Sequence, residues 1–125
     1  MNPKRFFKLD EQKAIETAIK SAEQATSAEI KLIVLRHCWQ DIKDKASEFF
    51  KKHRLYDTQE RNAVLILLVT TNREFLIYGD EGINSKVGQT FWDDVKDQMQ
   101  HHFRDNLFGI GLQKGIEQIG EKLKG

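Results

Sequence analysis

Cysteine and proline are almost absent from this chain of 125 residues, which contains one of each, Cys38 and Pro3. A single thiol excludes an internal disulfide, a CxxC redox pair and a cysteine-rich zinc site. With its one proline near the start, the chain has no proline-rich linker that would separate two domains. Its length is sufficient for one domain with its own core. We therefore expect residues 1–125 to form a single domain.

The sequence also lacks long apolar runs and an excess of either charge. No stretch approaches the roughly 18 apolar residues of a membrane-spanning helix. Lys and Arg together number 20 against 19 Asp and Glu, so bulk charge does not favour binding to many phosphates. The first residues are basic but lack the apolar core and cleavage site of a secretory signal. We expect a cytoplasmic protein with no transmembrane segment that binds no nucleic acid.

Hydrophobic periodicity predicts alternating helices and strands. Apolar residues three and four apart indicate helices over 10–26, 41–55, 90–103 and 108–124, with Asp10 and Asp41 as caps and Thr90 to Asp93 spaced like a capping box. Strands are predicted at 30–35, 63–69 and 74–79. A helical crossover makes the first two strands parallel, and the short turn at 71–73 makes the last two a hairpin. The order α-β-α-β-β-α-α predicts an α/β fold in which a small mixed sheet lies between helices.

Polar residues flank these strands at the edge where two strands begin and the third ends. They are Glu29, Thr58, Arg61, Asn62, Asp80 and Glu81. Because this topology brings the flanking segments to one edge, we expect these residues to converge. Carboxylate and amide oxygens suit a hard cation such as Ca²⁺, while Arg61 could clamp an anion or orient Asp80. The alternative is a structural ion pair between Arg61 and Asp80, with Asn62 as a turn residue.

Further candidates lie in the predicted third and fourth helices. Asp93 or Asp94 could add an oxygen ligand to the turn at Asp80, although the helix dipole explains acidic residues at a helix start. The glycines of segment 109–115 follow a helix instead of a strand, so they indicate close helix packing and not a dinucleotide site. No nucleophile elbow, P-loop or Asp-x-Asp motif is present. The sequence therefore predicts no organic cofactor and gives little support for an enzyme.

Several short motifs, taken together, resemble the TPM domain family over nearly the whole chain. They are Ser27-Ala28-Glu29-Ile30, Ala46-x-x-Phe49-Phe50, Thr58-x-x-Arg61-Asn62-Ala63-Val64-Leu65-Ile66, Gly79-Asp80-x-Gly82-Ile83, the helix with Trp92, and Gly111-Leu112-x-x-Gly115-Ile116. The resemblance is to short bacterial members. It implies a three-layer α/β/α sandwich, binding of a divalent cation as in some relatives, and the acid phosphatase activity proposed for plant relatives.

The resemblance and the residue pattern together suggest roles for the polar cluster. We expect metal ligands among Asp80, Glu81, Glu29 and Asp93, and ligand-orienting or anion-orienting roles for Arg61, Asn62 and Thr58. The expected ligand is Ca²⁺ or Mg²⁺.

Three functions remain open at this point. The leading hypothesis is a cation-assisted interaction or regulatory module that binds another protein in membrane or stress-related complexes. The alternative is a metal-dependent phosphatase, in which Asp80 is a metal ligand, Asp93 or Glu29 is the base, and Arg61 holds the phosphate. The third is a purely structural domain.

Overall fold

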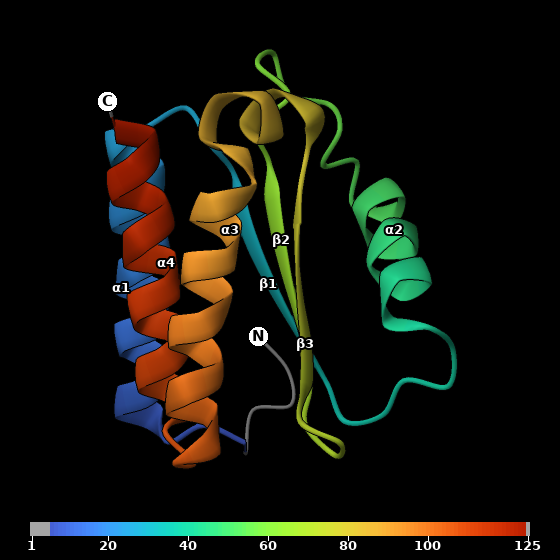
Figure 1. The fold of residues 1–125 in the computed structure, drawn as a ribbon, viewed down its shortest axis with the longest axis vertical. Helices are drawn as coiled ribbons and strands as arrows, with labels where there is room; N and C mark the ends of the chain where they lie inside the picture. The colour runs from blue at the N-terminus through green and yellow to red at the C-terminus, as the bar shows by residue number, and fades with distance from the viewer. Residues whose placement is uncertain (1–5, 125) are drawn as a thin grey trace. The chain divides into compact units, whose positions relative to one another are not determined.

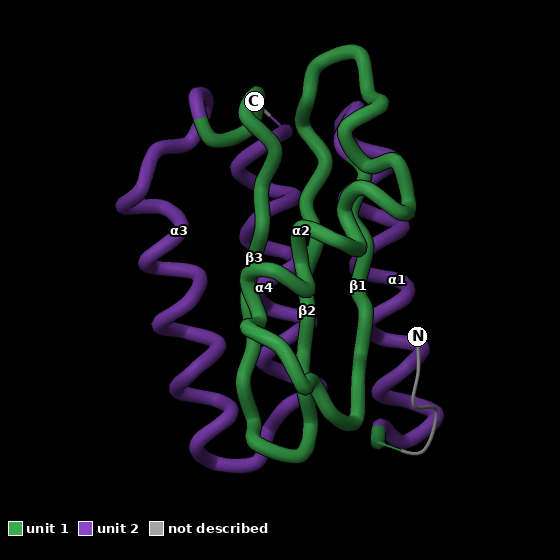
Figure 2. The backbone as a smooth tube through the Cα atoms, turned by 90° about the vertical axis from the view of Figure 1, so that its right-hand side faces the viewer, with its two compact units in different colours: residues 1–6, 29–84 green, residues 7–28, 85–125 purple. Residues whose placement is uncertain are grey.

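The computed structural model describes residues 6–124 and divides them into two compact units, which are coloured separately in Figure 2. The sheet unit comprises residue 6 and residues 29–84, and the helical unit comprises residues 7–28 and 85–124. The expectation of a single domain stays a prediction.

A three-stranded mixed sheet forms the centre of the sheet unit (Figure 1). Strands β1 (Ile30–Leu35) and β2 (Val64–Val69) pair in parallel, and β2 pairs with β3 (Glu74–Gly79) in antiparallel orientation. All six residues of β2 are buried. A central strand is buried on both faces and paired with a neighbouring strand at each edge, so an uninterrupted aliphatic run is typical of it. The predicted strands and their pairing are confirmed.

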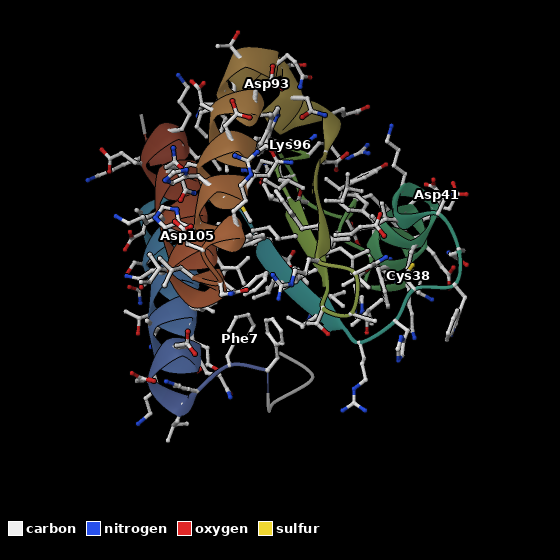
Figure 3. The ribbon with its side chains drawn as sticks, turned by 60° about the horizontal axis from the view of Figure 1, so that its bottom comes forward. Phe7, Cys38, Asp41, Asp93, Lys96 and Asp105 are labelled. Atoms are coloured by element: carbon white, nitrogen blue, oxygen red, sulfur yellow. The ribbon has the colours of Figure 1, made fainter. Side chains whose placement is uncertain are left out.

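Helix α2 (Ile42–Lys52) connects β1 to β2 and packs on the sheet. It begins where predicted, after Asp41, whose side chain accepts a hydrogen bond of 2.8 Å from the backbone N–H of Lys43. Figure 3 shows Asp41 at this helix start and Cys38 in the preceding loop. The core between α2 and the sheet consists of Ala46, Phe50, Leu55, Ala63, Leu65 and Leu67. The sheet unit therefore has an apolar core of its own.

The helical unit contains α1 (Leu9–Ala25), α4 (Phe108–Lys124) and most of α3 (Glu81–Arg104). Helices α1 and α4 approach closely at Gly120, where an added Cβ would lie 2.7 Å from Cβ of Ala22. Helices α3 and α4 meet at Gly111 and Gly115, where an added Cβ would lie 2.8 Å from the Phe103 ring or the Met99 sulfur. The interpretation of the 109–115 glycines as close helix packing is confirmed.

The predicted start of α1 is wrong. The helix begins at Leu9, with Lys8 at the N-cap, so that Asp10 lies inside the first turn. The N–H of Lys8 donates a hydrogen bond of 2.9 Å to the Glu11 side chain. The glutamate three residues after the N-cap therefore satisfies the backbone at the cap, and Asp10 is not needed there.

Helix α3 begins earlier than the predicted third helix, because it consists of two helical segments separated at Gly88. The helix begins at Glu81, and its backbone breaks at Gly88, which has φ 77°. The predicted helix from Thr90 lies in the second segment, just after this break, and the sequence predicts no helix over the first segment, which begins at Glu81. The side chain of Asp80 accepts a hydrogen bond of 2.8 Å from the N–H of Glu81, so Asp80 caps the true start.

The predicted class and order of elements are confirmed. The chain is a mixed α/β protein with the order α-β-α-β-β-α-α. Phe7 is 3% exposed, and its carbonyl accepts a hydrogen bond from the Gln12 side chain. Within residues 6–124, no helix is both long enough and apolar enough to cross a membrane.

Candidate functional site

One edge of the sheet collects the segments that carry the predicted site. Ile30 at the start of β1 lies opposite Val64 at the start of β2, and Val64 lies opposite Gly79 at the end of β3. The N–H of Val64 donates a hydrogen bond of 2.8 Å to the carbonyl of Glu29. The N–H of Asp80 donates one of 3.0 Å to the carbonyl of Ala63. The predicted convergence of these segments is confirmed.

Arg61 joins two carboxylates at this edge. Its Nε and Nη2 donate to Oδ2 and Oδ1 of Asp80 at 2.7 and 2.9 Å, and its Nη1 lies 3.2 Å from Oε1 of Glu81. The Asp80 side chain is only 7% exposed, whereas those of Arg61 and Glu81 are 42% and 73% exposed. The guanidinium therefore links a buried carboxylate to one at the surface.

The ion pair raises the pKa of Arg61 and engages both carboxylate oxygens of Asp80. The hydrogen bonds to Asp80 raise the pKa of the Arg61 guanidinium, desolvation opposes this effect, and the charges of Asp80 and Glu81 add to it. Oδ1 of Asp80 also accepts the N–H of Glu81. Both carboxylate oxygens of Asp80 are thus engaged, which is the structural ion pair that the sequence offered as an alternative.

A close backbone contact holds Arg61 beside Asp80. Arg61 has φ 52°, in the left-handed region, and its carbonyl accepts hydrogen bonds from Gly82 and Ile83 at 2.8 and 3.3 Å. A Cβ at position 82 would lie 2.7 Å from the carbonyl oxygen of Arg61 and would overlap that of Glu60. Only glycine allows this approach. Gly82 is therefore a positioning residue of the cluster, and its signal in the sequence is its place in the motif Gly79-Asp80-x-Gly82-Ile83.

Thr58 and Asn62 shape the loop that carries Arg61. The carbonyl of Thr58 accepts a hydrogen bond from the N–H of Arg61, and its Oγ1 accepts one from the N–H of Asn62, each at 3.3 Å. These bonds close a turn, as the structural alternative for Asn62 requires. A role for either side chain in orienting an anion stays a prediction.

The two remaining predicted ligands are Glu29 and Asp93. Glu29 is exposed at the sheet edge, one residue before β1. Asp93 projects from α3 in the helical unit (Figure 3), where its Oδ1 accepts a hydrogen bond from Gln89 at 3.0 Å. Within residues 6–124, no three His, Cys, Asp or Glu residues are grouped so that they could hold a metal ion. The metal-ligand roles stay predictions, and Asp80 and Glu81 are the two carboxylates that Arg61 brings together.

The fold and this sheet edge define a small α/β domain built around an arginine–carboxylate cluster. The family model described as the TPM domain matches residues 1–122, and the chain belongs to that family. A search of curated proteins finds no match.

Solved structures of similar fold support this assignment. The BA42 protein of the psychrophilic bacterium Bizionia argentinensis, solved by NMR, has a TM-score of 0.91 and 36% identity, with 98% of this chain and 84% of that chain covered. The N-terminal domain of the cg2496 protein of Corynebacterium glutamicum has a TM-score of 0.75 and 12% identity, over 94% of this chain and 74% of that one. The N-terminal domain of a protein from P. gingivalis has a TM-score of 0.72 and 15% identity, with 97% of this chain and 78% of that chain covered. The last two similarities concern the fold alone.

Proposed function

We propose that this TPM domain is a non-catalytic interaction module that binds a hydrated Ca²⁺ or Mg²⁺ at the sheet edge and, when loaded, binds another protein. The observation that carries the proposal is the pair of adjacent carboxylates, Asp80 and Glu81, which share Arg61 as their counter-charge. Mg²⁺ is commonly held by one or two carboxylates while it keeps several waters. Two carboxylates therefore suit a weakly held, hydrated cation.

Arg61 would compete with the cation for the same oxygens. The cluster holds one positive charge on Arg61 and two negative charges on Asp80 and Glu81, which leaves one net negative charge. A bound divalent cation would turn this into one net positive charge. The displaced guanidinium would then be free to bind a carboxylate in bidentate fashion. Loading would thus prepare the surface for an acidic segment of a partner protein.

A metal-dependent phosphatase would use the same sheet edge. In that mechanism Arg61 holds the phosphate, so it too requires the cation to displace Arg61 from Asp80 and Glu81. The resemblance to the family motivates this alternative, and a phosphatase assay belongs in the same set of experiments.

The test is a titration of the isotope-labelled full chain with CaCl₂ and MgCl₂, followed by amide NMR. We expect saturable shifts around Asp80 and Glu81. Arg61→Gln should bind the cation more tightly, because the competing guanidinium is gone, and Asp80→Asn should bind it more weakly. Arg54→Gln is the matched control, since Arg54 forms an exposed ion pair with Asp57 in the same unit.

A glutamate-rich peptide probes the second half of the proposal, and we expect it to bind only when the cation is present. Absence of saturable shifts in the millimolar range, or equal affinity in Arg61→Gln and the wild type, would overturn cation binding. Equal affinity for the peptide with and without the cation would overturn the proposal that cation binding prepares the surface for a partner protein. Hydrolysis of p-nitrophenyl phosphate that disappears in a folded Asp80→Asn variant would replace the proposal with the phosphatase.

A further inference from the structure

Trp39 is the most exposed large hydrophobic residue among residues 6–124, at 92%. It lies in the loop of residues 36–41 between β1 and α2, at the opposite end of β1 from the Arg61 cluster. Its indole stacks on the His37 imidazole, with the ring centroids 5.3 Å apart and the planes at 15°. Tryptophan buries a large apolar area and is enriched among the residues that dominate protein interfaces. So exposed an indole is a candidate anchor for a partner.

Hydrogen bonds at both ends hold this loop, which we call the Trp39 loop. At its start, the carbonyl of Arg36 accepts hydrogen bonds from the N–H of Thr71, at 3.2 Å, and from the Thr71 hydroxyl. Near its end, Nε2 of Gln40 donates to Oε2 of Glu48 on α2 at 3.0 Å. Because an ordered segment loses less conformational entropy on binding, these bonds prepare Trp39 for a contact.

A cleft of about 840 Å³ lies between α3 and α4 in the helical unit. Phe91 of α3 contributes an aromatic ring, and the ammonium of Lys122 on α4 lies 5.8 Å from the centroid of this ring. The cleft is also lined by the charged residues Lys114, Glu117 and Glu121. Since sites for drug-sized molecules usually span about 300–1,000 Å³, the cleft has room for an indole and its neighbours.

The charges of the cleft complement the Trp39 loop. Glu117 and Glu121 form no ion pair within residues 6–124, and the exposed Arg36 forms none there either. The ammonium groups of Lys114 and Lys122 attract an electron-rich ring, and indole is the strongest such ring among the side chains. The lining therefore suits a loop that presents an indole together with an arginine.

We propose that the Trp39 loop of one copy of this chain binds in the α3–α4 cleft of a second copy. The indole packs on Phe91 and against the ammonium of Lys122, while the guanidinium of Arg36 pairs with the cleft glutamates. A second copy is the occupant because the chain carries both complementary surfaces, and Trp39 is too exposed to fill the cleft of its own chain.

The two surfaces differ, so the contact is heterologous: each copy binds one neighbour with its loop and another with its cleft. An interface with one large anchor is small, so the association should be weak. The contact uses no residue of the Arg61 cluster and is independent of the cation proposed there.

Sedimentation velocity of the full chain measures this association. The average mass should rise as the concentration is increased from micromolar to millimolar. Trp39→Ala should weaken the association at least about tenfold, because it removes the central anchor. Tyr56→Ala is the matched control, since Tyr56 is another exposed aromatic residue of the sheet unit and lies outside the Trp39 loop.

The double variant Glu117→Lys/Glu121→Lys tests the cleft, because it replaces the partners of Arg36 with repelling charges. It should weaken the association as Trp39→Ala does. All three substituted residues are exposed, so neither variant should lower the unfolding temperature.

Mixing the two variants tests whether the contact joins different surfaces. Trp39→Ala retains the cleft, and the double glutamate variant retains the loop. An equimolar mixture should therefore form a one-to-one dimer that grows no further, although each variant alone stays monomeric. In a labelled double variant, the Nε1–H signal of Trp39 should shift when unlabelled Trp39→Ala is added.

Four results would overturn the proposal. A wild-type chain that stays monomeric at millimolar concentration would exclude self-association. Association that Trp39→Ala leaves unchanged would exclude the Trp39 loop as the anchor. A mixture of the two variants that stays monomeric, while the wild type associates, would exclude the contact between loop and cleft. A shift of the Trp39 signal with phosphatidylcholine–phosphatidylglycerol vesicles, in a chain that stays monomeric, would replace the second copy with a lipid surface.

Discussion

Replacing Asp80 with asparagine should destabilise the folded chain, because this carboxylate is buried and fully engaged. Its Oδ1 accepts hydrogen bonds from Nη2 of Arg61 and from the N–H of Glu81, and its Oδ2 accepts one from Nε of Arg61. Asparagine retains one oxygen, which can replace Oδ1. Its NH₂ group would replace Oδ2 and would face Nε of Arg61, so a donor would oppose a donor.

The expected cost follows from this inventory. A hydrogen bond to a charged group contributes about 1.5–3 kcal/mol, and the substitution removes one such bond at Oδ2 of Asp80. Water can reach the partly exposed arginine and recover some of the loss, while the two remaining bonds weaken because the carboxylate charge is gone. We expect Asp80→Asn to lower the free energy of unfolding by about 2 kcal/mol.

Urea unfolding followed by circular dichroism measures this change. With a slope of about 2 kcal/mol per molar urea, the midpoint should fall by about 1 M. Asp57→Asn is the matched control, since it removes the carboxylate of an ion pair with Arg54. The side chains of Arg54 and Asp57 are 71% and 65% exposed. The control should change the unfolding free energy by less than about 0.5 kcal/mol. Equal, small effects of both substitutions would refute the argument that burial makes the Asp80 pair different.

Two further predictions concern the sheet unit. Gly82→Ala should lower the unfolding free energy by at least about 2 kcal/mol, because the new Cβ would overlap the carbonyl oxygen of Glu60 and press on that of Arg61; an unchanged thermal midpoint would contradict this. The hydrogen bond from Gln40, followed by the charge of Lys45, lowers the pKa of Glu48. The lowered pKa of Glu48 stabilises the folded chain at pH values above the pKa of Glu48 in the unfolded chain. This stabilisation is lost as the pH falls through the pKa of Glu48 in the folded chain. Gln40→Ala should therefore raise the pKa of Glu48 in a carboxyl NMR titration, and an unchanged pKa would show that the bond from Gln40 has no effect.

Local patterns were sufficient for most of the secondary structure and for the sheet. The aliphatic run of β2 and the short turn before β3 depend on neighbouring residues alone, so the sequence predicts them directly. The parallel pairing of β1 with β2 follows from the helix between them, through the handedness of such crossovers. These rules also predict that Arg61 and Asp80 lie at the same edge of the sheet.

The helix starts depended on contacts that local patterns do not contain. The helix predicted from Thr90 lies in the second segment of α3, whereas the first segment begins at Glu81, where Asp80 caps it and Gly82 packs against the backbone at Arg61. Residues 61 and 82 are distant in the chain, so their contact exists only once the sheet has formed. A capping motif near Thr90 therefore does not reveal the additional segment that begins at Glu81.

The sequence by itself determined the α/β class, the order of the elements, and the meeting of the polar segments at one sheet edge, because periodicity and connection length decide these features locally. Only the tertiary structure decided that Arg61 is engaged by Asp80 and Glu81 instead of being free. The physical reason is that hydrogen bonding and burial of a side chain depend on atoms from distant parts of the chain, whose distances the residue order does not specify.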